Sequence, residues 1–103
     1  MPADWRGYKK LKFDIYCPDE DNLTIYVRVN DSNYRGSRFD FNDRFNKEVE
    51  IKPGWNYLSF DIEDIQNAPA GREMDMKDID DIGFFAVNLT QPRVLYTDNW
   101  RLE

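Results

Sequence analysis

The sequence predicts an all-β fold, an antiparallel sandwich of two sheets that forms a single domain over residues 1–103. Short runs that alternate apolar and polar residues, separated by turn residues, are the first observation. The second is the composition, which is 16% aromatic and 33% charged. Bulky rings would fill the space between two sheets while charged side chains cover both outer faces. A chain of this length has room for one such core.

The expected strands follow one another at short intervals, with apolar residues at every second position. About seven strands are expected on this pattern. Their inward-facing residues are Leu11, Phe13 and Ile15; Ile25, Val27 and Val29; Phe39, Phe41 and Phe45; Val49 and Ile51; Leu58, Phe60 and Ile62; Ile82, Phe84 and Ala86; and the closing run from Tyr96 to Leu102. Phe85 and Val87 make the sixth strand apolar on its other face too, so we expect that strand to be central or covered.

Turn and helix signals interrupt this pattern. Lys47 falls on the inward register, so a bulge or a strand break is expected near Asn46. Residues 53–54, Pro-Gly, predict a turn. A single helical turn is expected over residues 61–66, and a second one after Asp75.

The closing strand places an acid among large apolar side chains. Asp98 shares one face of the expected strand with three such residues. They are Tyr96, Trp100 and Leu102. A carboxylate in that position is costly to bury unless it is paired, hydrogen-bonded or metal-bound. Three interpretations stay open: a ligand of a structural calcium ion, an acceptor of backbone N–H groups at a strand end, or a partner of an arginine such as Arg72 or Arg101.

Composition excludes several functional classes. The chain has no histidine, which removes Ser-His-Asp and Cys-His catalysis and the usual zinc sites. Cys17 is the only cysteine, so we expect no internal disulfide and a packing role at a strand end. The net charge of −6 disfavours nucleic acid and anionic lipid as partners, and no apolar run is long enough to insert directly into a membrane. A small sandwich offers little concavity, so we expect no enzymatic activity.

Outward-facing rings and hydrogen-bonding groups suggest a binding surface. Tyr26 and Arg28 lie on one expected strand, and Tyr57 and Ser59 lie on another. If these strands are neighbours, their side chains form one surface suited to sugars, which present an apolar ring face and a rim of hydroxyls. Ordinary cross-strand pairing is the alternative. Trp55 follows a turn and is either a platform at the rim or a plug in the core.

A second group of polar residues brackets the long polar loop. Asp31, Asp43 and Arg44 are expected to line a cleft together with Tyr34. The alternative is an ion pair between Asp31 and Arg44 that holds two adjacent strands in register. In the acidic stretch 75–81, the spacing does not match an EF-hand loop, and solvated charge with turn capping explains it better.

Five segments, in order, resemble the jelly-roll carbohydrate-binding modules of galactose-binding-like type. Residues 5–16 resemble the opening pattern W-x-x-Y-x-x-L-x-F-D-V-Y of these modules, and residues 95–102 resemble their closing strand. Residues 42–46, 53–56 and 68–76 follow in the order such domains show. The nearest likeness is to the extramembrane module attached to some VanZ-like bacterial membrane proteins, and it covers nearly the whole chain.

The resemblance implies a non-catalytic module that binds an oligo- or polysaccharide. It implies a bacterial parent protein in which the module is extracytoplasmic or secreted. It also implies that Asp98 helps to hold a structural calcium ion, with no other cofactor required. Two departures stand out: one or two strands ahead of Trp5 are missing, and Asn30 and Tyr34 stand where the family pattern leads us to expect histidines.

Without these strands, one sheet edge is expected to be unpaired and open to a protein partner. A bare sheet edge would allow two copies to pair as a homodimer. The alternative function is therefore a structural or protein–protein interaction sandwich, part of a larger bacterial protein, that does not bind sugar.

Overall fold

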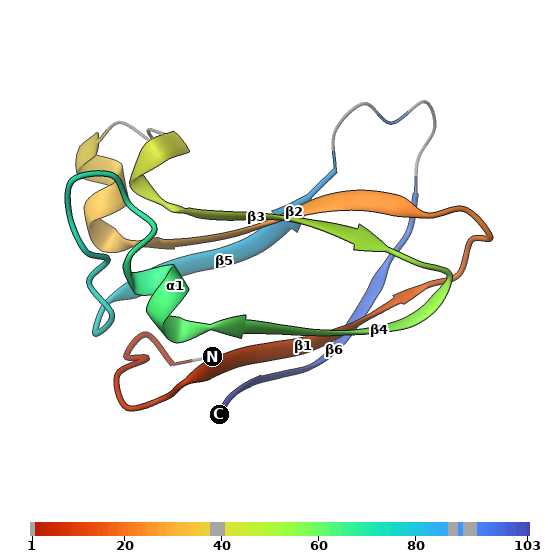
Figure 1. Ribbon diagram of the computed structural model, residues 1–103, viewed down its shortest axis with the longest axis horizontal. Helices are drawn as coiled ribbons and strands as arrows, with labels where there is room; N and C mark the ends of the chain where they lie inside the picture. The colour runs from red at the N-terminus through yellow and green to blue at the C-terminus, as the bar shows by residue number, and fades with distance from the viewer. Residues whose placement is uncertain (1, 38–40, 87–88, 90–92) are drawn as a thin grey trace.

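The computed structural model describes residues 2–37, 41–86, 89 and 93–103, the side chains of residues 35–37 excepted. In these residues, two three-stranded antiparallel sheets pack together, which confirms the predicted two-sheet sandwich (Figure 1). The first sheet has the strand order β4-β1-β6 and the second β3-β2-β5. The strands are β1 (Lys10–Cys17), β2 (Leu23–Asp31), β3 (Phe45–Ile51), β4 (Gly54–Asp61), β5 (Ile79–Phe85) and β6 (Tyr96–Leu102).

The core lies between the sheets, where the alternation of the sequence places it. All the predicted inward residues of the two central strands are fully buried, and they are Leu11, Phe13 and Ile15 of β1 and Ile25, Val27 and Val29 of β2. Trp5, from the segment before β1, closes one end of the core and is also buried. Its backbone N–H donates to the carbonyl of Met76 at 2.7 Å. The N-terminal segment is thereby tied to the loop that precedes β5.

The predicted helical turn is present as α1 (Ile62–Gln66). Asp61 occupies the N-cap position, but its side chain makes no capping hydrogen bond and pairs with Lys10 instead. Ile62 begins the helix rather than extending β4, and it is buried together with Ile65. After Asp75 the chain makes only a turn, in which the N–H of residue 78 donates to the carbonyl of Asp75 at 3.1 Å.

The stretch before β3 differs from the prediction. Short 3-10 helices form at η1 (Ser32–Ser37) and η2 (Phe41–Asp43), so Phe41 is not in a strand, and Phe39 lies outside the described residues. The described chain has six strands where about seven were expected. Of the two alternatives expected near Asn46, the bulge is not formed, because β3 pairs with β2 in unbroken register and Lys47 lies opposite Val27. The strand break is formed, since η2 ends at Asp43 and β3 begins only at Phe45. At a sheet edge, a lysine can keep its stem over apolar surface and its ammonium in water.

The prediction for the strand around Phe84 is corrected in part. β5 is an edge strand in the described sheet, not a central one. Phe84 packs against the core, while Phe85 stacks on Tyr26 across the outer face with ring centroids 5.5 Å apart. A neighbouring ring therefore covers the second apolar face. Val87 lies outside the described residues.

β4 and β6 form the two edges of the first sheet. Pairing of such an edge with a second copy of the chain stays a prediction. No helix in the described ranges is long and apolar enough to cross a membrane.

Candidate functional site

A bulge in β6 decides which side chains face outward from the first sheet. Lys12 lies opposite Arg101, and Asp14 lies opposite Asp98. Between these pairs β6 has two residues, Asn99 and Trp100, where β1 has only Phe13. Asn99 has a φ of 61°, in the left-handed region that asparagine tolerates better than most residues. The extra residue shifts the side-chain alternation of β6 by one position.

This shift corrects the predicted face of the closing strand. Trp100 and Leu102 pack against the core, with the Trp100 ring stacked on Phe13 at 3.8 Å between centroids. Tyr96 and Asp98 are exposed and lie on the outer register. Asp98 is therefore not buried among apolar residues. Its Oδ1 accepts the backbone N–H of Asn99 at 2.8 Å. This agrees with the second of the three open interpretations in the kind of donor, but Asp98 lies at the bulge within β6 and not at a strand end.

Four rings gather on the outer face of the first sheet, and we call them the aromatic platform: Tyr16, Trp55, Tyr57 and Tyr96. Trp55 and Tyr96 are register partners of Tyr16 from its two sides. The Tyr16 ring lies 5.2 Å from that of Trp55 and 6.4 Å from that of Tyr96. Trp55 is 51% exposed, Tyr57 76% and Tyr96 58%. Three adjacent strands, seen side by side in Figure 1, thus present one continuous aromatic surface to solvent.

Two carboxylates lie beside the rings. Asp14 is opposite Tyr57 on one side and Asp98 on the other. Asn99 bridges the two acids, because its backbone N–H donates to Asp98 and its side-chain amide donates to Oδ2 of Asp14 at 3.3 Å. Asp98 is exposed, whereas Asp14 is only 8% exposed, so Asp98 is the acceptor that solvent reaches at this border of the platform.

A tight turn places Trp55 at the rim of the sheet. Gly54 has a φ of 87°, which glycine adopts without strain. The side-chain amide of Asn56 donates to the carbonyls of Lys52 at 2.8 Å and Gly54 at 3.1 Å, and its oxygen accepts the N–H of Lys52 at 2.9 Å. Trp55 lies at the rim, 51% exposed, and does not plug the core. Its role as a platform for a ligand stays a prediction.

The left-handed conformation of Asn99 gives a first prediction. Replacing Asn99 with valine should destabilise the fold by about 2 kcal/mol relative to Asn99→Gly, because a β-branched residue is strained at positive φ. Both variants lose the side-chain hydrogen bond to Asp14, so the difference between them measures the cost of the left-handed backbone conformation at position 99. Urea unfolding measures the difference. Equal stability of the two variants would show that the bulge does not need this conformation.

Tyr26 and Arg28 do not join the platform. They lie on β2, and Tyr57 and Ser59 lie on β4, in different sheets. The single surface expected from these four residues is therefore not formed. The guanidinium of Arg28 donates to Asp81 at 2.7 Å, and the Tyr26 ring is stacked on its cross-strand neighbour, so cross-strand pairing describes this face.

The residues of the expected polar cleft are engaged with one another or with a distant arginine. The predicted ion pair between Asp31 and Arg44 is wrong. Asp31 is fully buried, and its carboxylate accepts hydrogen bonds from both terminal nitrogens of Arg72, at 2.7 and 2.9 Å. Arg72 also donates to Asp43 through Nε at 2.6 Å. Arg44 instead donates to the hydroxyl of the buried Tyr34 at 3.1 Å. We call Asp31, Asp43 and Arg72 the carboxylate–arginine clasp, and its contacts are structural.

The surroundings of Asp98 bear on the calcium expectation. Asp98 and Asp14 supply two carboxylates, whereas Ca²⁺ takes six to eight oxygens. Among the described residues, no three His, Cys, Asp or Glu side chains gather in a way that could hold a metal ion. The described residues at Asp98 therefore do not fit a calcium ion by themselves, and structural calcium stays a prediction.

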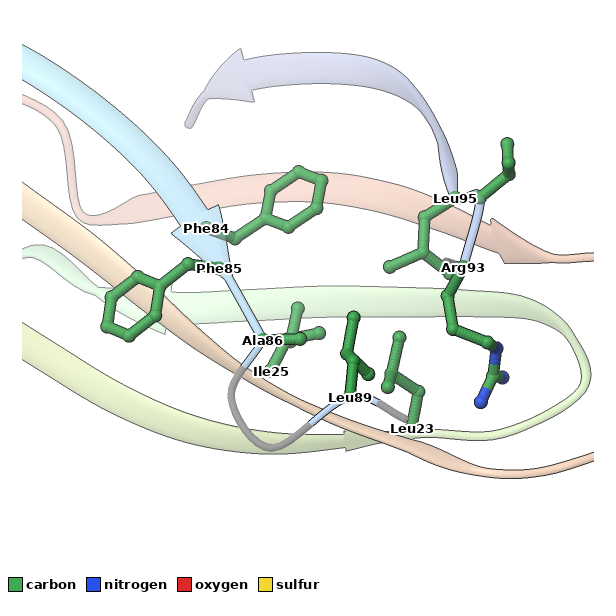
Figure 2. Close-up of a pocket in the computed structure, with 9 residues that line it drawn as sticks. Leu23, Ile25, Phe84, Phe85, Ala86, Leu89, Arg93 and Leu95 are labelled. Atoms are coloured by element: carbon green, nitrogen blue, oxygen red, sulfur yellow. The ribbon is translucent and has the colours of Figure 1, made fainter. Parts of the chain in front are cut away.

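A cavity of about 420 Å³ opens between the sheets beside β5 (Figure 2). Its lining is mostly apolar and includes Leu23, Phe84 and Leu95. The lining arginine, Arg93, already donates to Asp19 at 2.5 Å. A ligand pocket usually adds a few convergent polar groups to apolar walls. Since the charged group here is engaged, the aromatic platform is the stronger candidate.

Comparisons with protein-family models, with curated proteins and with solved structures gave no match for this chain. The resemblance to jelly-roll binding modules therefore rests on the sequence motifs, and it stays a prediction.

Of the predicted site residues, the structure brings only Trp55 and Tyr57 to the platform. Tyr16, Tyr96 and Asp14 were missed. The alternation of β1 does place Tyr16 and Asp14 outward, and this signal could have identified them. What the alternation lacks is the strand order, which brings the three strands together.

Proposed function

We propose that this chain is a non-catalytic carbohydrate-binding module and that the aromatic platform is its binding surface. The observation that carries the proposal is the row formed by Trp55, Tyr16 and Tyr96 on three adjacent strands, with two carboxylates at its border. Sugar rings have apolar faces that stack on aromatic rings, and their hydroxyls donate to carboxylates. Both kinds of group are found together on this face.

The openness of the surface supports binding rather than catalysis. Three of the four rings are more than half exposed, so a bound sugar would remain partly in water. Catalytic sites gain much of their effect by excluding water. Affinity is expected to be weak for the same reason, and the proposal includes no catalytic step. A bacterial parent protein and a location outside the cytoplasm are part of the proposal, and the sequence motifs alone support them.

Affinity electrophoresis in gels that contain soluble neutral polysaccharides tests this function. The native chain should be retarded in at least one gel. Trp55→Ala should weaken the interaction about tenfold, because a stacking ring contributes about 1 kcal/mol or more. Tyr26→Ala, an aromatic substitution on the opposite sheet, is the control and should migrate like the native chain.

Two outcomes would contradict the proposal. Loss of retardation in Tyr26→Ala but not in Trp55→Ala would move the binding surface to the second sheet. No retardation in any gel, together with self-association in sedimentation, would favour the protein-interaction module.

A further inference from the structure

The platform rings form a row that runs across the strands. Trp55, Tyr16 and Tyr96 are direct register partners on β4, β1 and β6. Neighbouring strands lie about 4.8 Å apart, so the row spans two such steps. The Tyr16 ring is tilted by 51° to Trp55 and by 41° to Tyr96. One flat surface cannot lie against all three rings, whereas a single flexible chain can turn from one ring to the next.

A second row of side chains lies beside the rings, and its two acids determine which ligand charge the platform tolerates. Tyr57, Asp14 and Asp98 are also direct register partners, one step along the strands from the first row. Ionised carboxylates accept hydrogen bonds and repel other anions. A chain lying on the first row would bring one of its edges against these acids. Hydroxyl groups on that edge would donate to them, whereas carboxylate or sulfate groups would be repelled.

Basic residues on the same outer face are already engaged by acids. Lys10 pairs with Asp61, and Lys12 and Arg101 both pair with Glu103, at 3.4 and 2.8 Å. Lys12 and Arg101 lie opposite each other, one step along the strands from Asp14 and Asp98, and Lys10 lies one step further away. Because Glu103 and Asp61 are already paired with these cations, their charges offset the two acids beside the platform only in part.

We infer, on the basis of the proposed function, that the ligand is a single chain of a neutral polysaccharide. It lies across β4, β1 and β6, with its sugar faces on Trp55, Tyr16 and Tyr96 and its hydroxyl edge on the exposed Asp98, beside the buried Asp14. Acidic polysaccharides, such as polymers of uronic acids, are rejected by the two carboxylates.

The direction of the chain is tested by two tyrosine substitutions. A ligand across the strands contacts Tyr96, whereas a ligand along β4 contacts Trp55 and Tyr57. With a neutral polysaccharide that retards the native chain, Tyr96→Ala should therefore weaken binding about tenfold and Tyr57→Ala only about threefold or less. The reverse order would show that the ligand follows β4, and it would overturn the inference.

The charge preference is tested by gels that contain a polyuronate in place of a neutral polysaccharide. The native chain should bind the polyuronate more weakly than the neutral polymer, and added salt should reduce the difference. Asp98→Asn should strengthen polyuronate binding at least about fivefold, while binding of the neutral polymer changes by about threefold or less.

Glu48→Gln is the matched control, because Glu48 is exposed on β3 in the opposite sheet and loses the same single charge. If it strengthens polyuronate binding as much as Asp98→Asn does, the net charge of −6 and not the platform is responsible, and the inference is wrong. Polyuronate binding by the native chain equal to neutral binding would also overturn it, while the proposed function would stand. Absence of binding to every polymer would overturn both.

Discussion

Replacement of Arg72 with methionine is expected to lower the free energy of unfolding by about 3 kcal/mol at pH 7, because it leaves a buried carboxylate without its partner. Asp31 is fully buried and Arg72 is 27% exposed. Breaking such a pair from one side costs far more than an exposed ion pair contributes. Arg72 also holds Asp43, so the same substitution frees η2 and the loop after α1 from the end of β2.

The loss should depend on pH. Burial of Asp31 raises the pKa of its carboxyl, but the hydrogen bonds from Arg72 and from the N–H of Asp75 outweigh this, so the pKa is lowered overall. A carboxyl with a lowered pKa in the folded state stabilises the fold above its unfolded pKa, about 4, and this stabilisation is lost as the pH falls through the lower, folded pKa. In Arg72→Met the remaining burial opposes ionisation. The difference between the native chain and the variant should therefore be largest near neutral pH. It should shrink as the pH falls, first through the pKa of Asp31 in the folded variant and then through its lowered pKa in the native fold.

Urea unfolding at several pH values measures this difference. The matched control is Arg101→Met, which removes an arginine whose side chain is 41% exposed and paired with Glu103. Its loss should stay within about 0.5 kcal/mol. A similar small loss for Arg72→Met would show that the clasp does not stabilise the fold. A large loss that is the same at pH 3 and pH 7 would show that the charge of Asp31 is not its cause.

The sequence was most informative where structure depends on neighbours along the chain. Alternation located the core faces of β1 and β2, because side-chain period is carried by a single segment. The acids at 61 and 64 gave the right place for α1, although the Asp61 side chain makes no capping hydrogen bond there. The 3-10 helix at Phe41 is an exception, because apolar residues spaced two apart there also suit a short loop.

The sequence was least informative about which strands are neighbours. Tyr26 and Tyr57 both face outward, as predicted, but their strands belong to different sheets. Arg72, 41 positions from Asp31 along the chain, takes the place that the nearby Arg44 was expected to fill. Pairings of this kind depend on the packing of the whole fold, and spacing along the chain does not carry them.

The bulge at Asn99 explains why Asp98 does not share a face with Trp100, although the sequence predicted that it would. It affects both the stability of the fold and the proposed binding surface. A strand of strict alternation would put Asp98 and Trp100 on the same face. The extra residue separates them, so that Trp100 contributes to the core while Tyr96 and Asp98 contribute to the platform. A strained backbone position of this kind is often found where a strand must redirect its side chains.

Substitution of two tryptophans on opposite faces of the first sheet tests whether its inner face serves stability and its outer face serves binding. Trp100→Ala should lower the free energy of unfolding by about 3 kcal/mol, because it removes a large ring stacked on the fully buried Phe13. Trp55→Ala, the same substitution at a half-exposed position, should cost less than about 1 kcal/mol. Urea unfolding of both variants gives the comparison.

Binding should respond in the opposite order. At a temperature where Trp100→Ala is still folded, it should keep its retardation by a neutral polysaccharide that binds the native chain, whereas Trp55→Ala should lose it. Trp100→Phe, which keeps an aromatic ring on Phe13, should recover a large part of the stability. If Trp55→Ala proved as destabilising as Trp100→Ala, its loss of binding would reflect unfolding. The outer face could then no longer be separated from the core as a binding surface, and the effect of Tyr96→Ala on a folded chain would have to decide whether the platform binds glycan.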